Sequence, residues 1–244
     1  MLMYQIKDVV REHFGRIGLP TAILDLALAE GRKLIEHEAN FWWMEDEATF
    51  NLVVDQADYD IAASGGEITI PNFKDAQALF WRTTGTTHWD PVSLGENTKD
   101  DLDLLYGTAD EGSPEAAYLQ DKKLYIYPPK PQLTYDMKLY YWGYTTNPAG
   151  NNDTADELTN NWGMALIYAA LIWGYEIYLK DLQGATYWRT LLGGPQFGKG
   201  GEIAKLKREN LKRGWRSRMV LVPHVGPGRL NAQRLNNLQL YPRR

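Results

Sequence analysis

The segment AYLQDKKLYIYPPKPQLTYDMKLYYWGY, residues 117–144, decides the fold class of this chain. Tyrosines alternate with Leu and Ile over residues 124–127, which is typical of a β-strand. Gln120-Asp121 and the proline-rich run at 128–131 indicate turns, because proline cannot donate a hydrogen bond inside a sheet. The segment therefore predicts two or three strands joined by short connections.

Apolar residues also occur at every second position in segments closer to the N-terminus. Residues 48–61 and 67–71 read as further strands bounded by Asp-rich and Gly-rich turns. Residues 98–106 read as a short helix with an acidic start. Together these segments predict a β-rich region over residues 46–152.

Apolar residues with helical spacing lie on both sides of this region. Helices are expected over residues 3–17, 21–43, 158–179, 183–192 and 202–216. Thr154 and Glu157 match a capping box at the start of the longest apolar one. The chain thus begins and ends in helices, and its strands lie between them.

This order of parts predicts an α+β fold. The N- and C-terminal helices are expected to pack as one helical bundle, with an antiparallel β-rich lobe inserted between them. The expected parts are residues 1–45 and 153–215 for the helices, 46–152 for the lobe and 216–244 for an extended C-terminal arm.

Residues 158–175 carry no charged side chain, so a membrane span has to be weighed. A central helix surrounded by other helices is also apolar on all sides, and we favour that burial. The start of the chain, MLMYQIKDVVREHFG, has charges throughout and no apolar segment typical of a signal peptide. We expect synthesis in the cytoplasm and no membrane partner.

Charge divides the chain into two unequal parts. Residues 1–198 hold 14 basic and 29 acidic side chains, whereas residues 199–244 hold 12 basic and two acidic ones. The net charges are therefore −15 and +10, which sum to the formal net charge of −5. A basic tail on an acidic body indicates an acidic partner, either a protein surface or a nucleic acid. We favour a protein, because the basic residues are too dilute for a typical nucleic-acid tail.

The predicted arm, residues 216–244, combines arginines with apolar side chains. Three prolines in it disfavour a continuous helix. Such a segment cannot bury its apolar side chains alone, so we expect it to dock on a partner. The residues expected to make this contact are Arg216, Arg218, Met219, Leu221, Arg229, Arg234, Leu238, Tyr241, Arg243 and Arg244. The alternative is a tail that folds back on its own acidic body.

The sequence contains no complete motif for catalysis or metal binding. The absence of cysteine excludes disulfides, a thiol nucleophile and thiolate metal ligands. Residues 193–199 fit G-x-x-x-x-G-K, but Gly200 stands where a phosphate-binding loop needs Ser or Thr. Glu36, His37 and Glu38 point about 100° apart on a helix and cannot converge on one ion. We expect no catalytic residue, no bound cofactor and no metal site.

Aromatic residues are abundant, with nine Trp, fifteen Tyr and six Phe. Trp42, Trp43, Trp162 and Trp173 lie on or at the end of apolar helical segments. We expect these four to pack in the core or against another subunit. The alternative is an exposed platform on which sugars stack.

Several strings together resemble the head-to-tail adaptor, or connector, proteins of tailed bacteriophages, including the gatekeeper-type tail tubular proteins. The strings are LALAEGRKLIEHEANFWW (26–43), ATFNLVVDQADYDI (48–61), ITIPNFKDAQAL (68–79), AAYLQDKKLYIYPPKP (116–131), KLYYWGY (138–144) and ATYWRTLL (185–192). The resemblance covers residues 20–192, and the Gly-rich break at 193–201 departs from a continuous C-terminal helix.

The resemblance implies a structural protein of the virion head-tail junction with no catalytic site. It implies a ring of identical copies, commonly twelvefold, that binds the portal protein on one side and a tail or nozzle protein on the other. Double-stranded DNA would pass through the ring during genome ejection. An acidic channel wall would repel that DNA and let it slide. The competing hypothesis is an aromatic-rich carbohydrate-binding tail module, which would be expected as a monomer.

Overall fold

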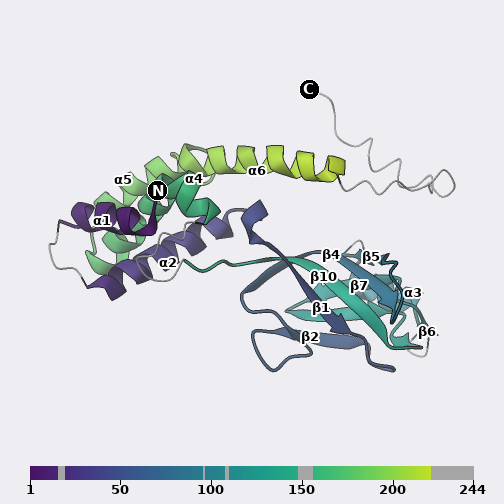
Figure 1. Cartoon of the computed structure of the whole chain (residues 1–244). Helices are drawn as coiled ribbons and strands as arrows, with labels where there is room; N and C mark the ends of the chain where they lie inside the picture. The colour runs from purple at the N-terminus through teal and green to yellow at the C-terminus, as the bar shows by residue number, and fades with distance from the viewer. Residues whose placement is uncertain (16–19, 96, 108–109, 148–155, 221–244) are drawn as a thin grey trace.

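The computed structural model describes residues 1–15, 20–95, 97–107, 110–147 and 156–220, with the backbone alone over 214–220. Figure 1 shows two parts: a group of helices built from both ends of the chain, and a sheet built from its middle. The long helix α6 begins among the other helices and extends beyond them.

The main sheet has eight strands in the order β1-β10-β4-β5-β7-β8-β2-β3. The strands are β1 (Glu45–Asn51), β2 (Asp58–Ala62), β3 (Ile68–Thr69), β4 (Phe73–Thr83), β5 (Asp90–Leu94), β7 (Ala116–Gln120), β8 (Lys123–Tyr127) and β10 (Tyr135–Gly143). Strands β1 and β3, at the two ends of this order, also contact each other. The sheet is therefore nearly closed on itself.

Alternation along β10 decides which side chains enter the core of the sheet. Met137 and Leu139 are fully buried, whereas Lys138 between them is half-buried. Leu139 lies in register with Ala48 of β1 and with Leu79 of β4. Because successive side chains of a strand point to opposite faces, one strand can supply both the core and the surface.

A small unit covers one end of the sheet. Helix α3 (Lys99–Leu105) packs Leu102 against Ala116 and Tyr127, and it begins at a capping box formed by Thr98 and Asp101. Strands β6 (Glu111–Gly112) and β9 (Lys130–Pro131) form a separate two-stranded pairing nearby.

The helical part has its own core. Its elements are α1 (Met3–His13), α2 (Thr21–His37), a 3₁₀ turn (Trp42–Met44), α4 (Glu157–Trp173), a π-helical segment (Gly174–Tyr178), α5 (Leu182–Gly193) and α6 (Gly201–Val220). Ile6, Leu24, Leu166, Leu192 and Ile203, one from each of the five α-helices, are fully buried in that core. Residues from both ends of the chain therefore have to meet before this core exists.

Helices α2 and α4 lie very close to each other at Gly31. A Cβ atom at this position would lie 2.6 Å from the backbone nitrogen of Ala170 and 2.9 Å from the carbonyl carbon of Ala169. Both are backbone atoms, so a side chain cannot be accommodated by a rotamer change. The absence of a side chain at Gly31 therefore sets the distance between the two helices.

The predicted fold class is wrong in its architecture. We expected a helical bundle with an inserted antiparallel lobe, whereas an eight-stranded, nearly closed mixed sheet dominates an α+β fold. Strands β5 and β7 pair in parallel, and so do β2 and β3. The residues between β5 and β7 include α3, which gives the chain the length that a parallel connection needs. The spacing of apolar residues identifies a strand. It does not show which strand it pairs with, or whether the pairing is parallel or antiparallel.

Two local predictions also need correction. The predicted extended arm begins at residue 216, but α6 continues to Val220, so Arg216, Arg218 and Met219 lie in a helix. The cap of α4 is Asp156, whose side chain accepts a hydrogen bond from the backbone of Thr159 (2.9 Å). Thr154, the predicted cap, lies outside the described residues.

The uncharged stretch at 158–175 is largely buried within the helical part, as expected, because α1, α2, α5 and α6 all contact α4. Across the described ranges, no helix combines the length and the apolar character needed to cross a membrane. Trp43, Trp162 and Trp173 pack against the helical core, which confirms that prediction for these three tryptophans.

We predict that Gly31→Ala lowers the free energy of unfolding by about 1–3 kcal/mol, the usual cost of overpacking a core. Helix propensity alone would give the opposite sign, since Ala favours a helix over Gly by about 1 kcal/mol. Chemical denaturation followed by circular dichroism measures the change. The exposed neighbour Lys33, changed to Ala, is the control and should shift stability by less than about 0.5 kcal/mol. A stabilised Gly31→Ala variant would contradict the close approach.

Candidate functional site

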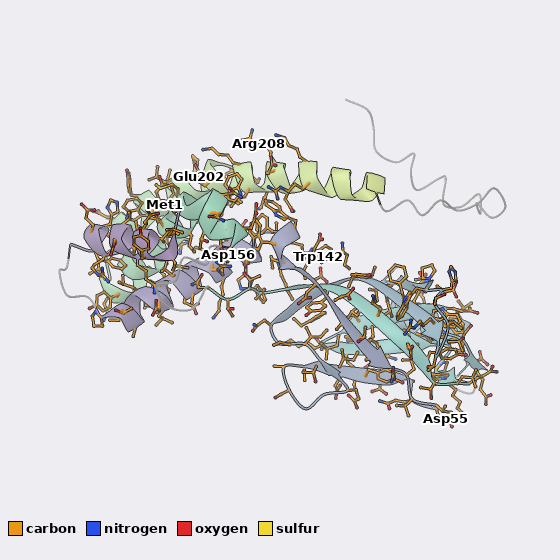
Figure 2. The ribbon with its side chains drawn as sticks, viewed as in Figure 1. Met1, Asp55, Trp142, Asp156, Glu202 and Arg208 are labelled. Atoms are coloured by element: carbon orange, nitrogen blue, oxygen red, sulfur yellow. The ribbon has the colours of Figure 1, made fainter. Side chains whose placement is uncertain are left out.

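Two chain segments connect the helices with the sheet, and both pass through one small region. Residues 38–44 lead from α2 into β1, and residues 144–147 lead out of β10 in the direction of α4. Figure 2 places Trp142 and Asp156 at this region, between the two parts of the molecule. We call it the junction and define it by Arg32, Glu36, Thr145 and Asp156, which are joined by hydrogen bonds.

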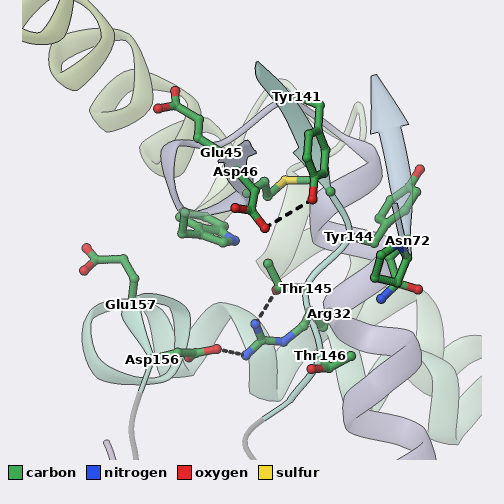
Figure 3. Close-up of a pocket in the computed structure, with 14 residues that line it drawn as sticks. Arg32, Glu45, Asp46, Asn72, Tyr141, Tyr144, Thr145, Thr146, Asp156 and Glu157 are labelled. Carbon is green, nitrogen blue, oxygen red and sulfur yellow. Dashed lines mark hydrogen bonds and ion pairs between the residues drawn. The ribbon is translucent and has the colours of Figure 1, made fainter. Parts of the chain in front are cut away.

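Arg32 is the central side chain of the junction and is 1% exposed. Its Nε donates to Asn147 Oδ1 (2.6 Å), its Nη1 donates to Thr145 Oγ1 (2.6 Å), and its Nη2 forms an ion pair with Asp156. Figure 3 shows the guanidinium between Thr145 and Asp156. A buried guanidinium requires such partners, because an unpaired buried charge is strongly destabilising. Arg32 therefore fixes the exit from the sheet and the start of α4 to α2.

Glu36 lies one helical turn after Arg32 and is completely buried. Its carboxylate accepts hydrogen bonds from the backbone nitrogen of Thr145 (3.0 Å) and from the Thr145 hydroxyl. It also accepts one from Trp43 Nε1 (3.2 Å), and Arg32 Nη1 lies 3.9 Å from its Oε1. Glu36 thus binds both connecting segments to α2 and neutralises part of the charge of Arg32.

Lys74 of β4 adds a link from the sheet to the end of α2. Its Nζ donates to the backbone oxygen of Ala39 (2.7 Å) and to that of Glu36. Burial lowers the pKa of Lys74, and the carboxylates of Glu36 and Asp75 partly oppose this shift. The ammonium ion is thus held by carbonyl oxygens at the point where α2 ends.

A pocket of about 420 Å³ opens at the junction. The acidic residues Glu45, Asp46, Asp156 and Glu157 line it, and Figure 3 shows Asp156 beside Arg32 and Asp46 bonded to Tyr141. Burial raises the pKa of Glu45. An acidic pocket of this kind can accept a basic side chain. Over the part of the chain that the structure describes, no group of three or more acidic or histidine residues is arranged to hold a metal ion.

Helix α6 is fastened to the first connecting segment. Asn210 accepts a hydrogen bond from the backbone nitrogen of Trp42 (3.1 Å) and donates one to the backbone oxygen of Asn40 (2.7 Å). Lys207 forms an ion pair with Glu38 (2.9 Å). Asn210 and Lys207 of α6, together with Glu38 of the segment, thus hold α6 beside the junction.

Arg213 extends this attachment by one further turn of α6. Its guanidinium lies 4.1 Å from the centre of the Trp42 ring, which is a cation–π contact. It also forms an ion pair with Glu157 of α4 (3.1 Å). Because Glu157 lines the pocket, α6 contributes indirectly to the electrostatics of the junction.

The structure describes no side chain of the predicted contact residues of the arm. Arg216, Arg218 and Met219 lie on α6, where the structure describes the backbone. The other predicted residues lie outside the described part of the chain: Leu221, Arg229, Arg234, Leu238, Tyr241, Arg243 and Arg244. Their role as a docking segment remains a prediction.

The sequence analysis missed Arg32 and considered Glu36 only as part of a rejected metal cluster on a solvated helix face, although a signal for a buried pair exists and Glu36 is fully buried. Both lie on the face of α2 that carries Leu28, Gly31 and Ile35, and both are buried with it. A basic and an acidic residue four positions apart within an apolar helix face indicate a buried ion pair. Their partners at 145–156 could not be identified in this way, because helix periodicity says nothing about distant segments.

Comparison with known protein families identifies a family model that matches most of the chain. Residues 1–217 match the sequence model of the family described as SU10 adaptor protein. No curated protein matches the chain. The matched region includes both halves of the helical part, the whole sheet and every residue of the junction.

We predict that Arg32→Ala lowers the free energy of unfolding by about 3–5 kcal/mol, because Glu36 and Asp156 lose their buried counter-charge. The matched control is Lys33→Ala, which removes an exposed ion pair with Glu30 on the same helix and should cost less than about 0.5 kcal/mol. Urea denaturation of both variants measures the difference. Equal losses in the two variants would show that the junction contributes no special stability.

Proposed function

Because this chain belongs to the SU10 adaptor protein family, a family of phage head-to-tail adaptors, we propose that it joins the portal protein to the tail as one subunit of a ring. The observation that carries the proposal is the extent of the match, which spans residues 1–217 and therefore every described element except the last turn of α6. In this role the protein is a structural component of the virion and performs no catalysis.

The charge of the sheet supports passage of DNA through such a ring. Residues 45–143 hold 18 acidic and seven basic side chains, a net charge of −11. Acidic residues on a channel wall would repel the phosphate backbone and prevent the counterion-releasing contacts that basic residues make with DNA. Double-stranded DNA could then slide during genome ejection without being bound.

The junction supports a mechanical role. A subunit that joins two other assemblies has to transmit force between its parts without changing shape. Buried, charge-assisted hydrogen bonds from Arg32 and Glu36 hold α2, α4 and the exit from β10 in one arrangement. The attachment of α6 through Asn210 adds a second constraint on the same segment.

The C-terminal segment is the part that we propose binds the portal protein, with a tail or nozzle protein at the opposite side of the ring. The segment after α6 carries the apolar residues expected to give affinity and the arginines expected to fix its position on an acidic surface. The segment follows directly on α6, which extends beyond the other helices in Figure 1. The assembled protein would be located at the head-tail junction after synthesis in the host cytoplasm.

The carbohydrate-binding hypothesis gains no support from the tryptophans considered for it. Trp43 stacks on Phe41 with ring centres 4.4 Å apart, and Trp162 and Trp173 pack against the helical core. Trp42 lies against Trp43 and under the guanidinium of Arg213. These rings are engaged within the protein and do not form a row for sugar binding.

The test of ring formation is native mass spectrometry and negative-stain imaging of the full chain, alone and with its portal protein. We expect closed rings with a central channel on the portal, of twelve copies if this chain follows the common pattern of such adaptors. A chain that remains monomeric in the presence of the portal protein would overturn the proposal.

We predict that a chain ending at Val220 keeps its fold but loses at least about tenfold in affinity for the portal protein, since it retains α6 and lacks the apolar residues and arginines beyond it. Thermal denaturation should give the same midpoint for both lengths, and surface plasmon resonance measures the affinity. A truncated chain that binds portal as tightly as the full chain would contradict the docking role. A much lower melting temperature would show that the segment stabilises the subunit's own fold.

A further inference from the structure

Helix α3 leaves two leucines exposed at the end of the sheet. Leu104 and Leu105 are 87% and 69% exposed, whereas Leu102 is the buried residue of this helix. Asp100 and Asp101 lie on the same short helix and are also exposed. We call these four residues the α3 patch. Adjacent leucines with this exposure, bordered by carboxylates, are typical of a surface that another protein covers.

Helix α6 carries a surface of the opposite charge. Ile203 and Leu206 bury one face of the helix, and Lys205, Arg208 and Lys212 point away from it along the other. Leu211 lies beside this row and is 63% exposed. We define Lys205, Arg208, Leu211 and Lys212 as the α6 patch.

The two patches match each other in composition. Each has exposed leucine next to charged side chains. Acidic residues outnumber the one lysine, Lys99, on α3, whereas basic residues outnumber Glu202 and Glu209, the ion-pair partners of Lys205 and Lys212, on α6. Residues 45–143 carry a net charge of −11, whereas residues 201–213 of α6 hold five basic and two acidic side chains, a net charge of +3. Two different, complementary surfaces on one molecule produce a head-to-tail contact, which closes into a ring when the rotation per copy allows it.

We propose that the α6 patch of one copy docks on the α3 patch of the next copy. The leucines would exclude water from the centre of the contact, and Lys205, Arg208 and Lys212 would pair with Asp100 and Asp101 at its edge. The proposal rests on the ring proposed above and identifies the surfaces that form it. The neighbouring copy is the occupant that charge complementarity within this one sequence favours.

Cysteine cross-linking tests this contact directly, because the natural chain contains no cysteine. Leu104→Cys and Leu211→Cys are made as separate full-length variants, mixed, and treated with a short bismaleimide linker at increasing protein concentration. Both positions are exposed, so neither change should disturb the fold. The matched control replaces Leu211→Cys with Ile177→Cys, a position on the π-helical segment that is 57% exposed.

The proposal requires dimers from the 104–211 mixture at concentrations where the 104–177 mixture gives none. A chain that carries both cysteines should form a ladder of larger products. The proposal is overturned if the 104–211 mixture never exceeds the control, or if each single variant cross-links with itself equally well.

Charge reversal provides a second test that needs no cysteine. Lys212→Glu and Asp100→Lys should each weaken self-association by about tenfold, a modest effect for a close charge pair across an interface. The chain with both changes should recover part of that loss, and Lys180→Glu, at an exposed position outside both patches, should leave association unchanged. Failure of the double variant to recover would overturn the pairing.

The same experiments separate this inference from the proposed function. Rings on the portal without a 104–211 cross-link would overturn the interface and leave the adaptor role standing. A 104–211 cross-link in a chain that never associates with portal would support the interface and overturn the adaptor role.

Discussion

The need to neutralise one buried guanidinium constrains the structure around the junction. Arg32 lies on the apolar face of α2, where it cannot reach water, so its hydrogen bonds have to be made by the protein. Thr145, Asn147 and Asp156 provide them from segments more than a hundred residues away in the chain. The direction in which the chain leaves β10, and the residue at which α4 begins, both follow from this requirement.

The surrounding contacts depend on the same arrangement. Asp156 can cap α4 and pair with Arg32 at once because its two carboxylate oxygens point in different directions, one to the backbone nitrogen of Thr159 and one to the guanidinium. Glu36 holds Trp43 and Thr145 together, which brings the incoming and outgoing segments side by side. Helix α6 then attaches to the incoming segment through Asn210. These contacts turn the two connecting segments into a rigid connection between the helices and the sheet.

Local patterns in the sequence were sufficient to predict most helices and strands. They were insufficient to predict how these elements pack together. Alternation over residues 124–127 identified β8, and the acidic start of the segment 98–106 identified α3, because both signals are complete within a few residues. The parallel pairing of β5 with β7 was not accessible, since direction depends on a connection whose path in space has no local pattern. The resemblance to phage adaptors identified the family correctly. For the junction, Arg32 and Glu36 could have been identified as a buried pair from their spacing on α2, whereas Thr145 and Asp156 carry no signal of their own.

The close approach of Gly31 to Ala170 has a consequence for the order of events on the ribosome. The two residues are about 140 positions apart, so at roughly 5–20 residues per second α2 waits on the order of 10–30 s for α4 to be synthesised. During that interval the whole sheet, residues 45–143, emerges and has all of its strands available for pairing. The sheet can therefore fold first, while the chain is still being synthesised. During this time α1 and α2 expose the apolar faces that later pack against α4. Chaperones that shield such faces would act on this protein early, before its last helices leave the exit tunnel.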